Sequence, residues 1–340
     1  MEQNDIQLLQ QEVRHVAAPL QSVRGEMGRI IAGQDMLIER LLLALITDGH
    51  ELLEGVPGLA KTLAVKTLAK TLSGSFSRLQ FTPDLLPADV IGTRIYNAAT
   101  GEFTTRIGPV SANIVLADEI NRAPAKVQSA LLEAMQEKQI TIGGERFALP
   151  DPFLVMATQN PIEQEGTYPL PEAQLDRFMF KLKVDYPSRS EEASVVERMA
   201  HPAPPPEALS VARVEDIIEA RKMVDRIYMD EKIVEYILDL VIATRPGQSK
   251  SLSDRQNGVK LSGIGHLVSF GASPRASIAL ALAAKGLALL RERAFVLPQD
   301  VKDLAPDVLR HRMVLSYEAE AENIDADAII ARLLAELRTP

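Results

Sequence analysis

The fold of this chain is decided by the stretch Gly55-Val56-Pro57-Gly58-Leu59-Ala60-Lys61-Thr62. It follows the apolar pair Leu52-Leu53, which we assign to a strand, and precedes a helical segment from Leu63 to Thr71. A glycine-rich turn between a strand and a helix is the setting of a phosphate-binding loop. There, backbone N–H groups surround phosphate oxygens, a lysine such as Lys61 adds charge at the β- and γ-phosphates, and a hydroxyl such as that of Thr62 ligates Mg²⁺. The stretch therefore predicts that Gly55 to Thr62 bind a nucleotide.

One position departs from the usual phosphate-loop pattern G-x-x-x-x-G-K-[S/T]. Ala60 stands where that pattern has its second glycine. Because alanine adopts a left-handed backbone poorly, a loop that needs a positive φ at Ala60 would be strained. A plain glycine and proline turn before a helix is the alternative interpretation.

Four further apolar runs predict the rest of a sheet. Each run is short, and helical segments separate them, which is the order that a parallel α/β sheet requires. The runs are Phe76–Phe81, Asn113–Ala117, Phe153–Ala157 and Phe178–Val184. Together with the strand before the loop they predict a five-stranded parallel sheet. Pro124 is expected in the first turn of the helix that follows the run ending at Ala117.

Polar side chains follow two of these strands. Asp118 and Glu119 come directly after the run that ends at Ala117, and Asn160 comes shortly after Ala157. Side chains at the carboxyl ends of parallel strands point into the ligand crevice of an α/β sheet. There Asp118 can hold Mg²⁺ through water, Glu119 can polarise an attacking water, and Asn160 can orient that water or contact the γ-phosphate. A solvated acidic loop and, for Asn160, a simple turn before a proline are the alternatives.

Two inserted hairpins and a change of composition organise the rest of the chain. Residues 93–96 pair with 102–105, and residues 139–142 pair with 146–149 across Gly143-Gly144, a favourable hairpin turn. Helical patterns dominate after residue 187, beyond a proline-rich stretch at 201–206. We predict a nucleotide-binding domain over residues 1–187, with a helical lead-in, and an all-helical domain over 188–340.

Composition excludes several classes of protein. The 340 residues suggest about two domains, and 46% apolar with 24% charged residues is ordinary for a globular protein. The net charge of −9 gives no general basic field for nucleic acid. Cysteine is absent, and the five histidines have no metal-ligand spacing. With no signal peptide and no apolar run of about 20 residues, we expect a cytoplasmic protein without a transmembrane segment.

Several motifs resemble those of the MoxR family of AAA+ ATPases. Beside the phosphate loop they are Leu116 to Pro124 (L-A-D-E-I-N-R-A-P), Ala157 to Pro161 (A-T-Q-N-P), Leu170 to Phe178 (L-P-E-A-Q-L-D-R-F) and Gly271 to Ala276 (G-A-S-P-R-A). They occur in the family's order, and the resemblance covers roughly residues 25–315. MoxR proteins also resemble this chain at Ala60.

The resemblance implies a fold, an assembly and residue roles. The fold is an αβα nucleotide-binding core with a helical lid, and the assembly is a ring, commonly a hexamer. Asp118 and Glu119 take the Walker B roles, and Asn160 takes that of the first sensor. The two hairpins correspond to the family's inserts.

Three arginines carry further expectations. In this family the Asp-Arg-Phe position faces a neighbouring subunit, which implies that Arg177 is an arginine finger on that subunit's γ-phosphate; a structural ion pair is the alternative. Ser273 and Pro274 suit the start of a helix, which places Arg275 in its first turn. A cation there is unfavourable by about 0.3–1 kcal/mol unless an anion binds beside it, so we interpret Arg275 as the second sensor rather than an exposed side chain.

For Arg122 a surface role is favoured over an interface contact.

These features predict a Mg²⁺-dependent ATPase that hydrolyses ATP to ADP and phosphate. The resemblance implies a chaperone that assembles, activates or remodels a client complex, often with a partner that bears a von Willebrand factor A domain. A chelatase or DNA-associated motor of the same clade and a nucleotide-switched scaffold without turnover are the alternatives. The acidic net charge disfavours direct DNA binding.

Overall fold

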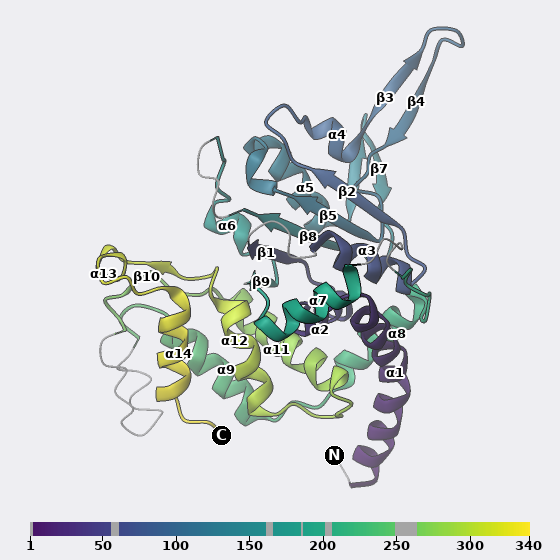
Figure 1. Ribbon diagram of the computed structural model, residues 1–340. Coiled ribbons are helices and arrows are strands. Elements are labelled where there is room, and N and C mark those ends of the chain that lie inside the picture. The colour runs from purple at the N-terminus through teal and green to yellow at the C-terminus, as the bar shows by residue number, and fades with distance from the viewer. Residues whose placement is uncertain (1–2, 56–60, 161–165, 185, 201–205, 249–263) are drawn as a thin grey trace. The chain divides into compact units, whose positions relative to one another are not determined.

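The structure of the chain is a computed structural model. The structure describes residues 3–55, 61–160, 166–184, 186–200, 206–248 and 264–340 (Figure 1). The predicted loop residues Val56, Pro57, Gly58, Leu59 and Ala60 therefore lie outside the described residues, as does most of the proline-rich stretch 201–206.

The chain forms two compact units. The sheet unit comprises Ala18–Phe178 and Leu182–Ala220, and the helical unit comprises Met1–Ala17, Met179–Lys181 and Arg221–Pro340. These limits differ from the domain boundary predicted after residue 187, which stays a prediction.

The sheet unit is built on five strands in the order β2–β5–β8–β1–β9. β2 pairs with β5, β5 with β8, and β8 with β1, and all three pairings are parallel. The strands are β1 (Glu51–Gly55), β2 (Phe76–Gln80), β5 (Ile114–Asp118), β8 (Leu154–Gln159) and β9 (Phe180–Val184). The predicted α/β fold with a five-stranded parallel sheet is confirmed.

Helices cover both faces of this sheet. α3 (Lys61–Thr71) contacts β2 and β5, and α5 (Ala125–Glu137) packs against the opposite face through a cluster that includes Val115 and Leu131. Since side chains alternate along a strand, Asp118 lies on the face opposite to that of Val115. Pro124 is the N-cap residue of α5, one position before the first turn in which the sequence placed it.

The sheet unit contains further helices, of which α2 is largely buried. They include α2 (Asp35–Ile46), α4 (Pro87–Ile91), the 3₁₀ turn η1 (Ile120–Arg122), α6 (Glu172–Leu175) and α7 (Arg189–Met199), while α1 (Gln3–Ile30) and α8 (Val214–Arg226) have residues in both units. The predicted helical lead-in corresponds to α1.

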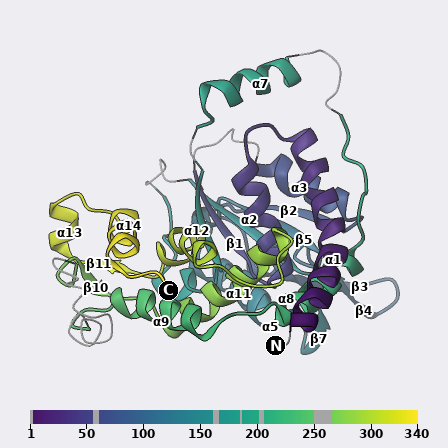
Figure 2. The same ribbon diagram turned by 90° about the horizontal axis from the view of Figure 1, so that it is seen from below.

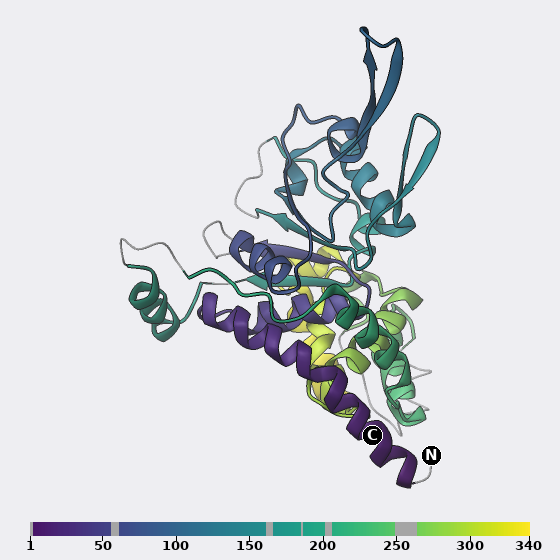
Figure 3. The same ribbon diagram turned by 90° about the vertical axis from the view of Figure 1, so that its right-hand side faces the viewer.

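Both predicted hairpins form. β3 (Gly92–Asn97) pairs with β4 (Glu102–Ile107), and β6 (Gln139–Ile142) pairs with β7 (Glu145–Ala148). Gly143 and Gly144 turn the second hairpin with φ values of 59° and 89°, which only glycine adopts freely. Both hairpins extend away from the five-stranded sheet (Figures 1 and 3).

The helical unit has its core between helices that contact one another, α9 (Glu231–Ala243), α11 (Pro274–Leu290) and α12 (Pro298–Leu309), as Figure 2 also shows. α12 and α9 also contact α14 (Ala326–Glu336), and α13 (Tyr317–Ala321) precedes it. A two-stranded antiparallel ribbon, β10 (Val268–Phe270) with β11 (Val314–Leu315), corrects the prediction that this part is entirely helical. Such short strands leave no alternating pattern in the sequence.

Among the residues that the structure describes, every helix is too short or too polar to cross a membrane.

Candidate functional site

The register of the sheet brings polar side chains together at the carboxyl ends of three strands. Gln80 of β2 lies opposite Asp118 of β5, and Leu116 of β5 lies opposite Met156 of β8. Because alternate residues share a face, Gln80, Asp118 and Thr158 lie on the same face of the sheet, the one that α3 covers. This is the crevice at which the sequence predicted the acidic pair.

Asp118 is held by two neighbouring strands. Thr158 on β8 donates its hydroxyl to Oδ1 of Asp118 at 2.7 Å. Arg78 on β2 donates to Oδ2 from Nη2 at 2.7 Å and from Nε at 3.2 Å. The Asp118 side chain is 19% exposed. Its carboxylate is therefore fixed in direction, with one edge toward solvent.

Glu119 has an unusual backbone and a well-defined set of partners. Its φ of 56° and ψ of 49° are left-handed, which a non-glycine residue adopts at an energetic cost. Its backbone N–H donates to Thr158 Oγ1 at 2.9 Å. Its Oε2 accepts hydrogen bonds from Gln80 Nε2 at 2.8 Å and from Arg122 Nη1 at 3.0 Å. Arg122 thus contacts the predicted catalytic carboxylate, in addition to its predicted place at the surface.

Lys61 lies close enough to Asp118 and Glu119 for their negative charges to act on its ammonium group. It is the first residue of α3, and its Nζ donates to the carbonyl oxygen of Gly55 at 2.5 Å. Burial lowers the pKa of Lys61 from its usual 10.5, and the negative charges of Asp118, Glu119 and Glu54 oppose that shift. A half-buried lysine at the start of a helix is a suitable phosphate-binding group, because its ammonium donates charge-assisted hydrogen bonds to phosphate oxygens.

Gly55 ends β1 against the neighbouring strand. A Cβ atom at this position would lie 2.5 Å from the carbonyl oxygen of Val184, so only glycine fits without a backbone shift. Thr62, the second residue of α3, is half-buried. Close packing with β9 is thus one reason for glycine at position 55, alongside the predicted contact with phosphate.

The donor set fits a nucleotide with Mg²⁺. One carboxylate from Asp118 and one hydroxyl from Thr62 are the kind of sparse, oxygen-only ligation that Mg²⁺ accepts, since this ion keeps several waters and uses substrate phosphates. In the described ranges no three His, Cys, Asp or Glu side chains come together as a cage for a metal ion. The site is therefore suited to a metal that arrives with phosphate.

The other predicted site residues lie in three different places. Asn160 follows β8 directly and is half-buried. Arg177 donates from Nη1 to the carbonyl oxygen of Leu132 in α5 at 3.0 Å, and it lines a pocket of about 520 Å³ with Glu133 and other residues of α5 and the second hairpin. Arg275 belongs to the helical unit. Asn160 is thus the one of the three that adjoins the strand ends.

Arg275 has the local geometry that the sequence predicts. Ser273 is the N-cap of α11, and its hydroxyl accepts the backbone N–H of Arg275 at 3.2 Å. Pro274 is the first residue of the helix, and Arg275 is exposed in the first turn.

Three residues of the strand-end cluster were missed by the sequence analysis, namely Arg78, Gln80 and Thr158. The signal was present in two of the strands. Thr158 precedes Asn160 at the end of an apolar run, and Arg78 and Gln80 alternate with the buried Leu79. Only the register, which the sequence does not give, reveals which of these meets Asp118 or Glu119.

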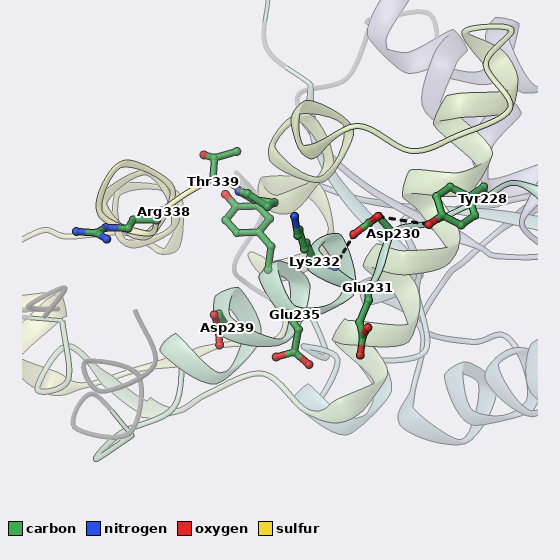
Figure 4. A pocket seen from close by; sticks show the side chains of 10 residues that line it. Tyr228, Asp230, Glu231, Lys232, Glu235, Asp239, Arg338 and Thr339 are labelled. Atoms are coloured by element: carbon green, nitrogen blue, oxygen red, sulfur yellow. Dashed lines mark hydrogen bonds between the residues drawn. The ribbon is translucent and has the colours of Figure 1, made fainter. Parts of the chain in front are cut away.

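A second pocket, of about 670 Å³, lies in the helical unit (Figure 4). Asp230 caps α9 there, accepting the backbone N–H of Lys232 at 2.9 Å and the hydroxyl of Tyr228 at 3.3 Å. The pocket is also lined by Glu231, Glu235, Tyr236, Asp239, Arg338, Thr339 and Pro340. This pocket contains none of the predicted site residues. The hydrogen bonds of Asp230 are those of an N-cap residue at the start of α9.

Comparisons with known proteins agree with this geometry. The profile of the ATPase family associated with various cellular activities (AAA) matches residues 50–180, and that of the AAA lid domain matches residues 264–333. Chaperone MoxR1 of Mycobacterium tuberculosis is 52% identical over 93% of this chain and 81% of its own length. Protein MoxR of Methylorubrum extorquens is 30% identical over 90% of this chain and 91% of its own length.

A solved structure agrees over the whole chain. A crystal structure named as a candidate ATPase from Cytophaga hutchinsonii ATCC 33406 matches with a TM-score of 0.89 and 45% identity, covering 99% of both chains. The acids and the lysine that converge at the strand ends lie within the matched AAA region. The chain is thus an α/β ATPase with a helical lid, and it belongs to the MoxR family of AAA+ ATPases.

Proposed function

We propose that this chain is a Mg²⁺-dependent ring ATPase, commonly a hexamer in its family, that acts as a chaperone on a client protein complex. The observation that carries the proposal is the cluster at the strand ends, where Asp118 and Glu119 are held by hydrogen bonds from neighbouring strands and Lys61 begins the helix that covers this face. The chaperone role is supported by the name of the M. tuberculosis relative.

The residues at the strand ends divide the chemistry between them. Bound Mg²⁺·ATP would supply the phosphates together with a cation that neutralises their charge. Lys61 would pair with the β- and γ-phosphates, and Thr62 and Asp118 would hold the metal ion. Glu119 would accept a proton from the attacking water, and Asn160 would orient that water.

Glu119 is restrained at one of its two carboxylate oxygens. Both hydrogen bonds to its Oε2 come from Gln80 and Arg122, which leaves the carboxylate facing protein donors. A water at the γ-phosphate would have to compete with these donors or use the other oxygen. The restraint therefore favours a state that is not yet arranged for hydrolysis.

Arg177 is the residue we propose to act between subunits, and the second sensor role is proposed for Arg275. Within its own subunit Arg177 donates to the Leu132 carbonyl on α5. In a ring, the contact between subunits is head-to-tail, so each subunit offers one surface to a neighbour's nucleotide. An arginine finger of this kind raises the rate of phosphoryl transfer by about 10³–10⁵ in related P-loop enzymes.

Mixing two inactive variants tests the shared site. Glu119→Gln and Arg177→Ala should each reduce hydrolysis by about 10²-fold or more. In an equimolar mixture, random assembly should leave about a quarter of the sites with an intact Glu119 and a neighbour's intact Arg177. Activity should therefore return when the two variants are mixed. In a separate measurement on the wild type alone, the hydrolysis rate per subunit should rise with protein concentration.

Two results would contradict this assembly. If Arg177→Ala alone keeps the wild-type rate at every concentration, the site is contained in one chain. If the wild type binds ATP but does not hydrolyse it even at high concentration, a nucleotide-switched scaffold describes the protein better. A client, and a partner with a von Willebrand factor A domain, are proposed from the family resemblance, and the cytoplasmic location stays a prediction.

A further inference from the structure

Arg78 contacts the carboxylate that we propose to face Mg²⁺. It lies two residues before Gln80 on β2, on the face that also carries Asp118. Its Nη2 and Nε both donate to the same oxygen of Asp118, Oδ2, at 2.7 and 3.2 Å. The Arg78 side chain is 50% exposed and that of Asp118 is 19% exposed. This is a partly exposed ion pair among the residues of the proposed nucleotide site.

The guanidinium of Arg78 is fixed at a second point. Its Nη2 also donates to Oε1 of Gln80 at 2.9 Å. Because a guanidinium has donors only, Gln80 must turn its amide oxygen to Arg78, which leaves its NH₂ group to donate to Glu119. Arg78 is therefore part of a network that spans both acids, whereas an isolated surface arginine would have many orientations.

The other oxygen of Asp118 does not depend on Arg78. Thr158 donates to Oδ1 at 2.7 Å, from the neighbouring strand β8. Loss of the arginine would remove a positive charge from Oδ2 while Thr158 still directs the carboxylate. Substitution of Arg78 can therefore remove the positive charge beside Asp118 while Thr158 keeps the orientation of the carboxylate.

A metal-bound water and an arginine N–H are equivalent at a carboxylate oxygen, since both donate a hydrogen bond and both bring positive charge. They would compete for Oδ2, and the two positive centres would repel each other at short range. We propose that Arg78 is a positioning residue that holds Oδ2 of Asp118 in the metal-free protein, leaves it when the site binds a divalent cation, and so weakens divalent-cation binding. The inference rests on the proposed Mg²⁺-dependent nucleotide site.

Mn²⁺ binding measures this effect without using hydrolysis. Free Mn²⁺ is followed by its electron paramagnetic resonance signal during titration into the full-length protein, with ADP at one fixed concentration in every sample. Arg78→Gln should bind Mn²⁺ about two- to tenfold more tightly than the wild type, as expected for removal of one half-exposed charge. Arg78→Lys keeps the charge but loses the fork of donors, so its Mn²⁺ affinity should lie between that of the wild type and that of Arg78→Gln. Higher salt should reduce the difference between Arg78→Gln and the wild type.

Two controls separate this inference from the proposed function. Arg226→Gln removes an exposed arginine that pairs with Glu12 in the helical unit, and it should leave Mn²⁺ affinity unchanged. Asp118→Asn should weaken Mn²⁺ binding strongly. If Asp118→Asn binds Mn²⁺ as the wild type does, the proposed metal site fails, and this inference fails with it.

If Asp118→Asn weakens binding but Arg78→Gln binds Mn²⁺ equally or less tightly than the wild type, only the role of Arg78 is overturned. The thermal unfolding of each variant, read by circular dichroism, establishes that the samples compared are folded.

Discussion

Two regions of the sheet unit differ in how their side chains are held. One is formed by the carboxyl ends of β2, β5 and β8, and the other is the β3–β4 hairpin. At the strand ends, Asp118 and Glu119 are each held by partners from neighbouring strands. On the hairpin, Tyr96 and Phe103 pair with each other at a ring distance of 5.1 Å, and they are 56% and 58% exposed.

The difference separates polar groups linked across three strands from exposed side chains that contact one another within one hairpin. Arg94 illustrates the second case, because its guanidinium lies 5.1 Å above the ring of Phe103 in the same hairpin. Polar groups at the strand ends are partly buried and interlinked, so loss of one partner leaves another unsatisfied. We therefore expect substitutions at the strand ends to have large effects and those on the hairpin to have small ones.

The largest effect is expected at Lys61. Lys61→Ala removes the cation that faces Asp118 and Glu119, and with it the charge that would bind phosphate. Since a hydrogen bond to a charged group contributes about 1.5–3 kcal/mol, ATP affinity should fall by roughly 10- to 150-fold. Equilibrium binding of a fluorescent ATP analogue measures this loss. An unchanged affinity would place the phosphates elsewhere.

The next largest effect is expected at Thr158. Thr158→Val keeps the shape but removes the hydroxyl that bonds both Oδ1 of Asp118 and the backbone N–H of Glu119. Each group left without a partner costs about 1–3 kcal/mol, so the free energy of unfolding should fall by a few kcal/mol. Urea unfolding measures it.

Thr104→Val on the hairpin is the matched control. Thr104 is exposed on β4, and valine is equally favourable in a strand. The free energy of unfolding should change by less than about 0.5 kcal/mol. Equal losses for Thr158→Val and Thr104→Val would remove the distinction between the two regions.

A smaller effect is expected from the exposed aromatic pair. Phe103→Ala removes the cross-strand contact with Tyr96 and the platform below Arg94. Such a pair contributes about 0.2–1 kcal/mol, so the melting temperature should decrease only slightly, and the basal ATPase rate should not change. A large loss of basal hydrolysis would link the hairpin to the site.

The smallest effect is expected at Glu26, which is remote from both regions in the sequence. Arg29 and the backbone N–H of Leu209 lower the pKa of Glu26 from 4.5 to about 2. A depressed pKa adds stability above about pH 4.5, and this contribution is lost as the pH falls toward about 2. The melting temperatures of the wild type and Glu26→Gln should therefore differ most near pH 6, and the difference should shrink below about pH 4.5 and vanish only as the pH falls to about 2. A constant difference would exclude this titration.

The sequence predicted the sheet better than it predicted the contacts across it. Apolar runs bounded by turns identified all five strands, and Gly143-Gly144 identified the second hairpin, because these are local signals. The pairing of Arg78 with Asp118 depends on the register between β2 and β5, which local patterns do not fix. The ribbon β10–β11 was missed because two or three residues do not form a recognisable period.

The site was predicted in its acids and incompletely in their partners. Asp118 and Glu119 follow an apolar strand directly, so alternation and strand polarity sufficed. Gln80 and Thr158 are ordinary polar residues whose role appears only when strands are paired. The roles of the predicted site residues in hydrolysis, Asp118 and Glu119 included, remain predictions, since they require nucleotide and, for Arg177, a neighbouring subunit.

The measurement that tests the central claim most directly is hydrolysis by Glu119→Gln set against its binding of ATP. The substitution keeps the size of the side chain but removes the base. The account predicts a turnover number about 10²–10⁴-fold lower than that of the wild type, with ATP affinity within a few-fold of the wild-type value. Hydrolysis at the wild-type rate would contradict the claim that this cluster of strand ends is the catalytic site.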